Sequence, residues 1–373
     1  MPRFTTAMWK LLHITTLDRY IIRKYLSTVF FSMLICTLIS MAIDFSDKVQ
    51  HFIEKPATLR NILLDYYVGF VLHMAGLLMP LYTLIGVVFF TSRMAFNAEI
   101  LSVLNAGVSF NRLLRPYLIA GGLVAALHFT LNNHLIPERN KLRLWFERTF
   151  VWTDQEKGKT AQVHFLVSPD VKVFIQNYNK ASKTATGLRL EKFDGNRVVS
   201  LLEAQTATWK KDPNIWEVRY YSIRSFDGLK EDYHFYPSPL DTMINLTPQD
   251  FIWYHNQNEE MTSAELREVI ARDQSRGLSN VKNYEIELLR RTADAFTNII
   301  LTIIGLAVAG RKVRGGMGLH LALGIGIGAM FILTSKFAVS FASSGTVPVA
   351  LGMWLPNIAF AGIAAWLVMK AQK

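Results

Sequence analysis

Six long apolar runs stand out along the chain, three before and three after a long polar interval. A helix needs about 20 mostly apolar residues to cross the hydrocarbon core of a bilayer, and each run reaches or approaches that length. The first run could belong to a signal peptide, but no small-residue cleavage site follows it. We therefore predict six membrane-spanning helices, at about residues 26–43, 63–90, 116–136, 295–310, 317–341 and 349–369.

The polar interval has the shorter period of strands. Alternating or β-branched residues predict strands at 171–178, 184–193, 197–202, 204–210 and 216–222. Asp194-Gly195-Asn196 is typical of a hairpin turn between two of them. Short strands at this spacing are typical of a sandwich, a jelly roll or a curved open sheet.

A helix is predicted at the end of the interval. Thr262 and Glu265 have the spacing of a capping box, and Gly277 suits the residue after the helix. The chain is then an α-helical integral membrane protein with an all-β domain between its third and fourth spans. We divide it into a first transmembrane half (1–136), the inserted domain with its helix (137–284) and a second transmembrane half (285–373).

Basic residues predict the orientation, because short cytoplasmic loops carry an excess of Lys and Arg. The other side has Lys48, Lys55 and Arg60, diluted by acidic residues, and no base at 342–348. We expect both termini in the cytoplasm and the inserted domain in the periplasm of a Gram-negative cell. The bases on the predicted cytoplasmic side are Arg19, Arg23, Lys24, Arg93, Arg112, Arg115, Arg311, Lys312 and Arg314.

Composition agrees with this class. Of the 373 residues, 51% are hydrophobic and 18% are charged, against about 25% charged in soluble domains. The net charge of +11 lies mostly beside apolar runs, which favours a membrane surface over nucleic acid. Cys36 is the one cysteine, so an intramolecular disulfide is impossible.

Recognisable catalytic motifs are missing from the sequence. It contains no phosphate-binding loop, no zinc signature and no nucleophile elbow, so we predict no enzyme activity, no metal and no directly bound cofactor. His73 and His128 fall inside predicted spans, where each either marks a functional site or is satisfied by a neighbouring helix.

A short amphipathic helix is predicted at about 97–106, in the loop after the second span. Asn97 is the expected cap and Glu99 lies in the first turn, where an anion complements the helix dipole. The helix either lies on the membrane or docks into a partner protein, and its lack of bases favours the partner. The predicted apolar face and C-terminal residue are Ile100, Leu101, Leu104 and Gly107.

Further candidates lie in the second half of the chain. Arg290 and Arg291 are either neutralised by nearby glutamates or hold lipid phosphate. Lys336, inside the fifth span, either faces a polar cavity or reaches towards the membrane surface. Gly324 and Gly328 have the spacing that lets membrane helices approach closely. The fifth span then either packs tightly on a neighbouring helix or slides against it as a gate.

Taken in order, these segments resemble the LptF/LptG permeases of lipopolysaccharide export over nearly the whole chain. The same order of three spans, exported domain and three spans is part of the resemblance. The motifs are Leu17-Asp18-Arg19-Tyr20-Ile21, Ala98-Glu99-Ile100-Leu101 before Ala106-Gly107-Val108, Tyr284-x-Ile286-Glu287 with Arg290-Arg291, Arg314-Gly315-Gly316-x-Gly318 and Trp354-x-Pro356-Asn357.

The resemblance implies a jelly-roll-like inserted domain and a permease subunit of an ATP-driven exporter in the bacterial inner membrane. Implied partners are a sister permease, an LptB-like cytoplasmic ATPase dimer that uses the ATP, and a periplasmic LptC/LptA-like bridge protein. Lipopolysaccharide would enter between the first and fifth spans of opposing subunits, and Glu99 matches the acidic residue of the ATPase-coupling helix. Some members carry a base where this chain has Asp44, and the nearest bases, Lys48 and Lys55, are the candidate lipid contacts here.

Two other classes remain as alternatives. One is a permease for another lipid or for lipoproteins, although such permeases resemble a four-span plan with the exported domain after the first span. The other is a non-transporting scaffold with a periplasmic binding domain, which leaves the 97–106 helix without a role.

Overall fold

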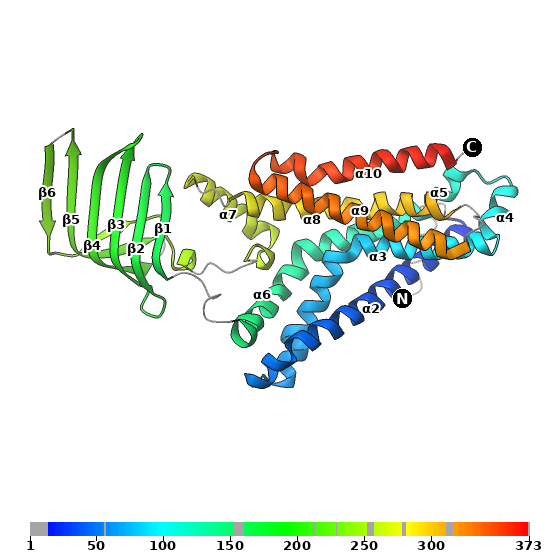
Figure 1. Cartoon of the computed structure of the whole chain (residues 1–373), viewed down its shortest axis with the longest axis horizontal. Helices are drawn as coiled ribbons and strands as arrows, with labels where there is room; N and C mark the ends of the chain where they lie inside the picture. Colours follow the sequence, from blue (N-terminus) through cyan, green and yellow to red (C-terminus); the bar gives the residue numbers. More distant parts are fainter. Residues whose placement is uncertain are drawn as a thin grey trace. The chain divides into compact units, whose positions relative to one another are not determined.

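A computed structural model provides the structure of the chain. It describes residues 14–55, 57–152, 160–211, 214–228, 230–251, 257–277, 281–310 and 316–371. The chain divides into two compact units (Figure 1). The helical unit contains the described residues of Met1–Phe150, Glu259–Ser263 and Glu285–Lys373, and the sheet unit those of Val151–Asn258 and Ala264–Tyr284.

Six helices of the described chain are long and apolar enough to cross a membrane, as predicted. Their order places three before and three after the sheet unit. The helical unit is built from α2 (Thr16–Glu54), η1 (Asn61–Tyr67), α3 (Val68–Phe96), α4 (Glu99–Asn105), α5 (Phe110–Thr130), η2 (Leu131–Leu135), α6 (Ile136–Phe146), η3 (Glu147–Val151), α8 (Val281–Ala309), α9 (Gly316–Ser344) and α10 (Val349–Ala371).

The helices extend beyond the apolar runs that predict them, because a helix ends where its backbone is capped rather than where hydropathy falls. α2 begins in a capping box in which Thr15 and Asp18 satisfy each other's backbone groups. The third span was expected to end near Ile136, but helical structure continues to Val151. Pro137 does not end it, since the wider π-helical turn η2 leads directly into α6 next to this residue.

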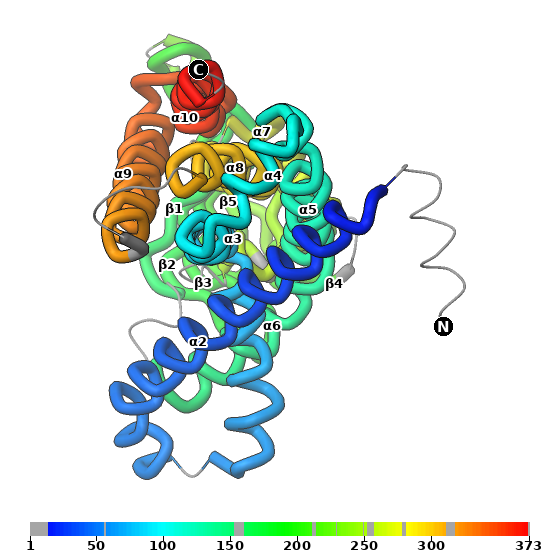
Figure 2. Tube along the Cα trace, turned by 90° about the vertical axis from the view of Figure 1, so that its right-hand side faces the viewer, coloured from blue at the N-terminus to red at the C-terminus, as the bar shows by residue number. Residues whose placement is uncertain are grey.

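Close helix contacts hold the unit together. Glycines let helices approach α3: a Cβ on Gly305 of α8 would lie 2.8 Å from Val87, and one on Gly324 of α9 would lie 2.9 Å from Val88. α9 and α10 run side by side, while α2 crosses the unit obliquely (Figures 1 and 2). Buried residues of α2, α3 and α5, such as Ile21, Val87 and Tyr117, form the main apolar cluster.

The described strands of the sheet unit form one antiparallel sheet in the order β1-β2-β3-β4-β5-β6. β6 and β7 pair with successive parts of the same side of β5, and Tyr220, between those parts, has a positive φ of 51°. The strands are β1 (Ala161–Ser168), β2 (Val171–Asn179), β3 (Thr184–Asp194), β4 (Arg197–Lys211), β5 (Ile215–Asp227), β6 (Lys230–Tyr236) and β7 (Leu240–Met243).

The strand predictions were correct in position but incomplete. The hairpin at Gly195, whose φ is 58°, is confirmed. The two predicted strands at 197–202 and 204–210 are one strand, β4, because the pairing with β3 and β5 continues across Glu203. The edge strands β1 and β6 and the short β7 were not predicted, since β6 is exposed along its whole length and has no buried face to mark it.

Two short 3₁₀ turns, η5 (Pro248–Phe251) and η6 (Gln257–Glu260), precede α7 (Ser263–Ser275). Gly277 follows α7 with a φ of 72°, as predicted for the residue after a helix. The predicted basic loop residues Arg311, Lys312 and Arg314, and Gly315 of the last glycine motif, lie outside the described residues.

Candidate functional site

The short helix α4 lies in the connection between α3 and α5. Asn97 does not cap it, contrary to prediction, because Asn97 is the C-cap residue of α3. The N-cap residue of α4 is Ala98, which has a left-handed φ of 58°. The amide of Asn97 instead donates a hydrogen bond to Glu99 Oε1, at 3.3 Å. Gly107 follows the helix with a φ of 85° and its N–H donates to the Leu104 carbonyl, as its predicted position requires.

The apolar residues of α4 face two directions. Ile100 is 2% exposed and packs into the main apolar cluster, where Val103 and Leu104 lie against it. Leu101 was predicted on the same face, but it is 51% exposed, because successive residues are about 100° apart around a helix. Phe96, at the end of α3, is exposed as well. One face of α4 is therefore fixed to the bundle and Leu101 is free to meet a partner.

Glu99 is held by a residue of the first span. The Tyr20 hydroxyl donates to Glu99 Oε2 at 3.1 Å, which links α2 to the first turn of α4. The carboxylate remains partly exposed. Its position at a helix N-terminus is the one in which a negative charge is stabilised by the helix dipole.

An ion pair between a buried aspartate and a partly exposed arginine links α2 to α5 at the same end of the unit. Asp18 is 1% exposed and accepts hydrogen bonds from both terminal nitrogens of Arg112, at 2.6 and 2.7 Å. Such a two-point contact is strong and sets the relative orientation of the two side chains. It was missed in the sequence analysis, where Asp18 was only part of a family motif. Ninety-four positions separate the partners, and no local pattern relates them.

The intramembrane histidine His128 is satisfied by its neighbours. Its Nε2 lies 2.8 Å from the Gly76 carbonyl, and the Asn298 amide lies 2.9 Å from its Nδ1. Asn298 also accepts a hydrogen bond from Thr83 at 3.0 Å. These contacts favour the structural interpretation of His128, because each ring nitrogen has a partner.

A second cluster of polar side chains lies at the C-terminal end of α6, next to Glu259 of η6. Arg143, 7% exposed, contacts Glu147 at 3.4 Å and Glu259 at 3.3 Å. His73 Nδ1 is 3.8 Å from the Glu259 carboxylate. Burial raises the pKa of Glu259 above the usual glutamate range, although Arg143 opposes the shift.

The candidate lipid contacts differ in what surrounds them. Arg290 and Arg291 both contact Glu287, at 2.6 and 3.0 Å, and Arg291 also donates to Ser263. Arg290 is nevertheless about a third exposed, whereas the Arg291 side chain is 4% exposed. Lys336 is exposed on α9.

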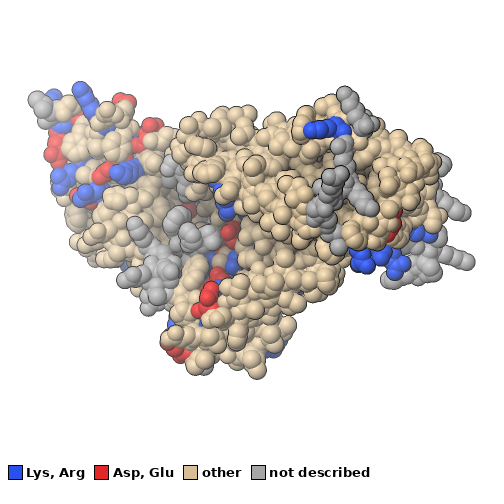
Figure 3. All heavy atoms as spheres, turned by 45° about the vertical axis from the view of Figure 1, so that its right-hand side comes forward, with Lys and Arg blue, Asp and Glu red and all other residues tan. Residues whose placement is uncertain are grey.

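The basic side chains near the C-terminal end of α2 are less accessible than that of Lys336. Lys48 contacts two carboxylates, Asp44 at 2.8 Å and Glu147 at 2.9 Å, so its charge is already neutralised. Lys55 is half-buried just after the last turn of α2. Figure 3 shows basic and acidic side chains next to one another in a band across an otherwise uncharged part of the helical unit.

The predicted close approach at the two glycines of α9 is present. A Cβ on Gly328 would lie 2.9 Å from Leu81 and 3.3 Å from Leu84 of α3, much like the one on Gly324. Any larger side chain at either position would have to push α9 away from α3.

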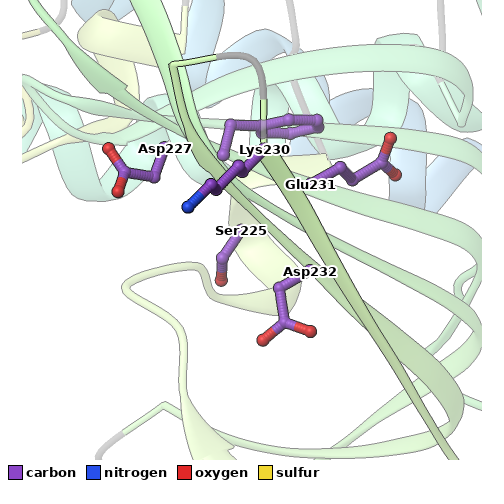
Figure 4. Close-up of a pocket in the computed structure, with 6 residues that line it drawn as sticks. Ser225, Asp227, Lys230, Glu231 and Asp232 are labelled. Carbon is purple, nitrogen blue, oxygen red and sulfur yellow. The ribbon is translucent and has the colours of Figure 1, made fainter.

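The sheet unit has a shallow pocket where β5 turns into β6. Asp227, Lys230, Glu231 and Asp232 line it, and their charged groups point apart (Figure 4). Such an arrangement gathers no nucleophile and base. Within the described ranges there is also no group of three residues placed to bind a metal ion.

Together, six helices that are long and apolar enough to span a membrane and an inserted antiparallel sheet define an integral membrane protein. The family model of the lipopolysaccharide export system permease LptF/LptG matches residues 19–370. The chain belongs to this family. It is a lipopolysaccharide-export permease of the inner membrane, and a transport subunit rather than a catalytic enzyme. No match was found among curated proteins.

Proposed function

We propose that this chain is one permease subunit of an ATP-driven exporter. It extracts lipopolysaccharide from the outer leaflet of the inner membrane and passes it through its β domain to a bridge towards the outer membrane. The observation that carries the proposal is α4: Ile100 and Leu104 pack into the bundle, while Glu99 and Leu101 remain accessible beside it. A partner that moves this helix moves the spans with it.

The proposal includes the source of energy. Each CH₂ group moved from a bilayer into water costs about 0.8 kcal/mol, so a lipid with several acyl chains is not extracted without work. The sequence has no phosphate-binding loop. ATP is therefore hydrolysed by a separate LptB-like dimer that docks on α4, and this chain binds no cofactor itself.

Orientation and the remaining partners follow from the same scheme. Both termini and α4 face the cytoplasm, and the sheet unit faces the periplasm. A sister LptF/LptG-type permease completes the cavity, and an LptC/LptA-like bridge protein receives the lipid. In this arrangement the inserted domain receives the lipid from the spans. Buried apolar residues such as Val173, Ile175 and Trp216 form the core of that domain.

Lipid entry is assigned to the first and fifth spans. In the most apolar stretch of α2 only 11% of the residues are buried, and in that of α9 only 22%, the lowest shares among the six described spans. Helices with so little packing inside their own subunit have surface available for an opposing subunit or for acyl chains. Both observations support gates at α2 and α9.

Two of the five candidate bases fit phosphate binding best. Lys336 is exposed on α9, and Arg290 keeps a third of its side chain accessible beside Glu287. We therefore assign lipid-phosphate contacts to Lys336 and Arg290. Arg290 also pairs with Glu287, but its side chain is more exposed (32%) than those of Arg291 (4%) and Lys48 (21%), and Lys48 pairs with two carboxylates. Lys55 is half-buried.

Purification of the tagged chain from its own cell in mild detergent tests the proposal. We expect a small ATPase, a second six-span permease and lipopolysaccharide to copurify. Recovery of the chain without an ATPase or a glycolipid, even after crosslinking, would contradict the proposal and favour the scaffold class.

A further inference from the structure

The first membrane helix is attached to the rest of the unit at its two ends. Near its start, Ile21 and Tyr25 are fully buried, and near its end Phe52 is 7% exposed. Val29 is also buried, at 5% exposed, but most apolar side chains between Val29 and Phe52 are exposed, among them Phe31, Leu34, Leu38, Ile39 and Ile43. The position of the far end of α2 therefore depends on a small number of contacts.

Lys48 makes ionic contacts at that end. Lys48 Nζ lies 2.8 Å from Asp44 and 2.9 Å from Glu147, which begins η3 directly after α6. Lys48 also donates to the Tyr66 hydroxyl, which in turn donates to Asp44 at 2.7 Å. The ammonium group of one lysine thus joins α2, η1 and η3.

The aromatic rings of Phe52, Tyr66 and Phe146 pack together near this ion pair. The Phe52 ring lies 6.0 Å from the Tyr66 ring and 5.7 Å from the Phe146 ring. The carboxylate of Glu147 is 9% exposed and that of Asp44 is 13% exposed. Exposed ion pairs contribute little to stability, but losing one partner of a shielded pair leaves an uncompensated charge that is costly.

The ionic contacts continue from Glu147 to the chain that returns from the sheet unit. Arg143 bridges Glu147 and Glu259, and the Asn140 amide donates to the Glu259 carbonyl at 3.3 Å. Next to it, Arg148 pairs with Glu260. Glu259 begins the short segment Glu259–Ser263, which belongs to the helical unit although the residues on both sides of it belong to the sheet unit.

We propose that Lys48 and Glu147 form an ionic latch that positions the outer end of the first span. Through Arg143 the latch joins α2 to the Glu259–Ser263 segment, so that the gate helix and the connection to the exported domain hold one another in place. This inference rests on the proposed function in taking α2 as a gate helix. It assigns Lys48 a positioning role, in place of the phosphate contact suggested by the sequence.

Distance measurements between spin labels test the latch. Labels are attached through Phe45→Cys on α2 and Trp145→Cys on α6, both about half exposed, in a Cys36→Ser background. The sample is the full permease complex in nanodiscs free of lipopolysaccharide. We expect one narrow distance distribution in the parent, and a second, longer-distance population in Lys48→Met and in Glu147→Gln.

Three controls make the result specific. Arg60→Met removes an exposed base near the same end and should leave the distribution unchanged. Lys48→Arg keeps a cation that can contact both carboxylates and should restore the narrow distribution. A second label pair, Phe30→Cys on α2 and Leu118→Cys on α5, reports the other half of α2 and should stay unchanged in every variant.

Two outcomes would overturn the latch. One is a Lys48→Met distance distribution indistinguishable from that of Arg60→Met, which would mean that Lys48 does not position α2. The other is equal broadening of both label pairs in Lys48→Met and Glu147→Gln, which would mean that the ion pair supports the whole fold. Because no lipopolysaccharide is present, the result is independent of whether the parent complex releases lipopolysaccharide with ATP, the separate test of the proposed function.

Discussion

The fourth and fifth membrane helices, α8 and α9, are held in place in different ways. Polar side chains of α8 reach four other helices: Asn298 contacts Thr83 of α3 and His128 of α5, Thr302 contacts Tyr25 of α2, and Thr297 contacts Asn357 of α10. Among the described residues of α9, side-chain hydrogen bonds such as Thr334 to Met330 stay within the helix, apart from that of Ser344 to Thr346 in the loop that follows.

This difference predicts that α8 is held more firmly than α9. Hydrogen bonds between membrane helices have directions and lengths that a sliding helix would break, whereas small residues packed on apolar side chains allow several positions. α9 meets α3 through Gly324 and Gly328. We infer that α8 is the fixed centre of the unit and that α9 can shift against it.

The largest expected loss of stability comes from overfilling the fixed contact. Gly305→Leu places a side chain where a Cβ already lies 2.8 Å from Val87, and overpacking of this kind costs about 1–3 kcal/mol of the free energy of unfolding. Gly324→Leu creates a similar overlap with Val88, but α9 can move away and the loss should be smaller. Unfolding in detergent, followed by circular dichroism, measures both.

Gly326→Leu is the matched control, since a Cβ there would meet nothing within 4 Å. Equal losses for Gly305→Leu and Gly324→Leu would show that α9 is as firmly held as α8.

The next largest effect is expected from the polar centre of α8. Asn298→Leu removes the partner of both His128 and Thr83, and hydrogen bonds between membrane helices are worth about 0.6–1.7 kcal/mol each. With two such bonds lost at the average value of about 0.6 kcal/mol each, the free energy of unfolding should fall by about 1 kcal/mol. Thr334→Val on α9, which breaks only a contact within its own helix, should change it by less than about 0.5 kcal/mol. A Thr334→Val variant as unstable as Asn298→Leu would remove the distinction between the two helices.

A smaller, pH-dependent effect is expected at Glu259. Burial raises the pKa of this carboxyl in the folded state, so the folded protein binds its proton more tightly than the unfolded chain. This contribution to stability is present below the unfolded pKa of glutamate and is lost as pH rises through the higher, folded pKa. Glu259→Gln should therefore show a shallower loss of melting temperature on going from acidic to neutral pH.

Melting temperatures of the parent and of Glu259→Gln across that pH range are the measurement. Glu268→Gln, which changes an exposed carboxyl of α7, serves as the control and should follow the parent. Parallel curves for the parent and Glu259→Gln would contradict the raised pKa.

The smallest effect on the free energy of unfolding is expected at α4. A substitution there should instead weaken binding of the ATPase. Leu101→Asp alters an exposed side chain, so stability should stay within about 0.5 kcal/mol of the parent. Loss of an apolar contact at the centre of an interface costs more than about 1 kcal/mol, so ATPase affinity should fall by about tenfold. Glu99→Ala should also lower ATPase affinity.

Ile100→Asp, on the buried face, should instead lower stability. Unchanged ATPase association and lipopolysaccharide export in both Leu101→Asp and Glu99→Ala would remove the coupling role.

Much of the fold could be predicted from local patterns. Six spans, the strands β2 to β5 and the hairpin at Gly195 were visible because hydrophobic periodicity and turn residues act over a few positions. The same reasoning located α4 and Gly107. It failed for Asn97 and Leu101, because the left-handed Ala98 shifts the start of the helix and the bundle decides which face is covered.

The pairings between distant residues could not be predicted. Lys48 was a plausible phosphate ligand until Glu147, 99 positions away, was found beside it. His128 was ambiguous until Asn298 was seen to satisfy it. A charged or polar side chain has the same sequence signature whether its partner is a lipid, water or another residue.

The class of protein, the number and order of its spans, the inserted β domain and the likeness to its family could therefore be predicted from the amino-acid sequence. Those features depend on hydrophobicity and turn chemistry, which act over neighbouring residues. The ion pairs, the exposed face of α4 and the spans held by polar contacts became visible only in the folded chain. These depend on distances between residues far apart in the chain, and such distances exist only once the helices have packed.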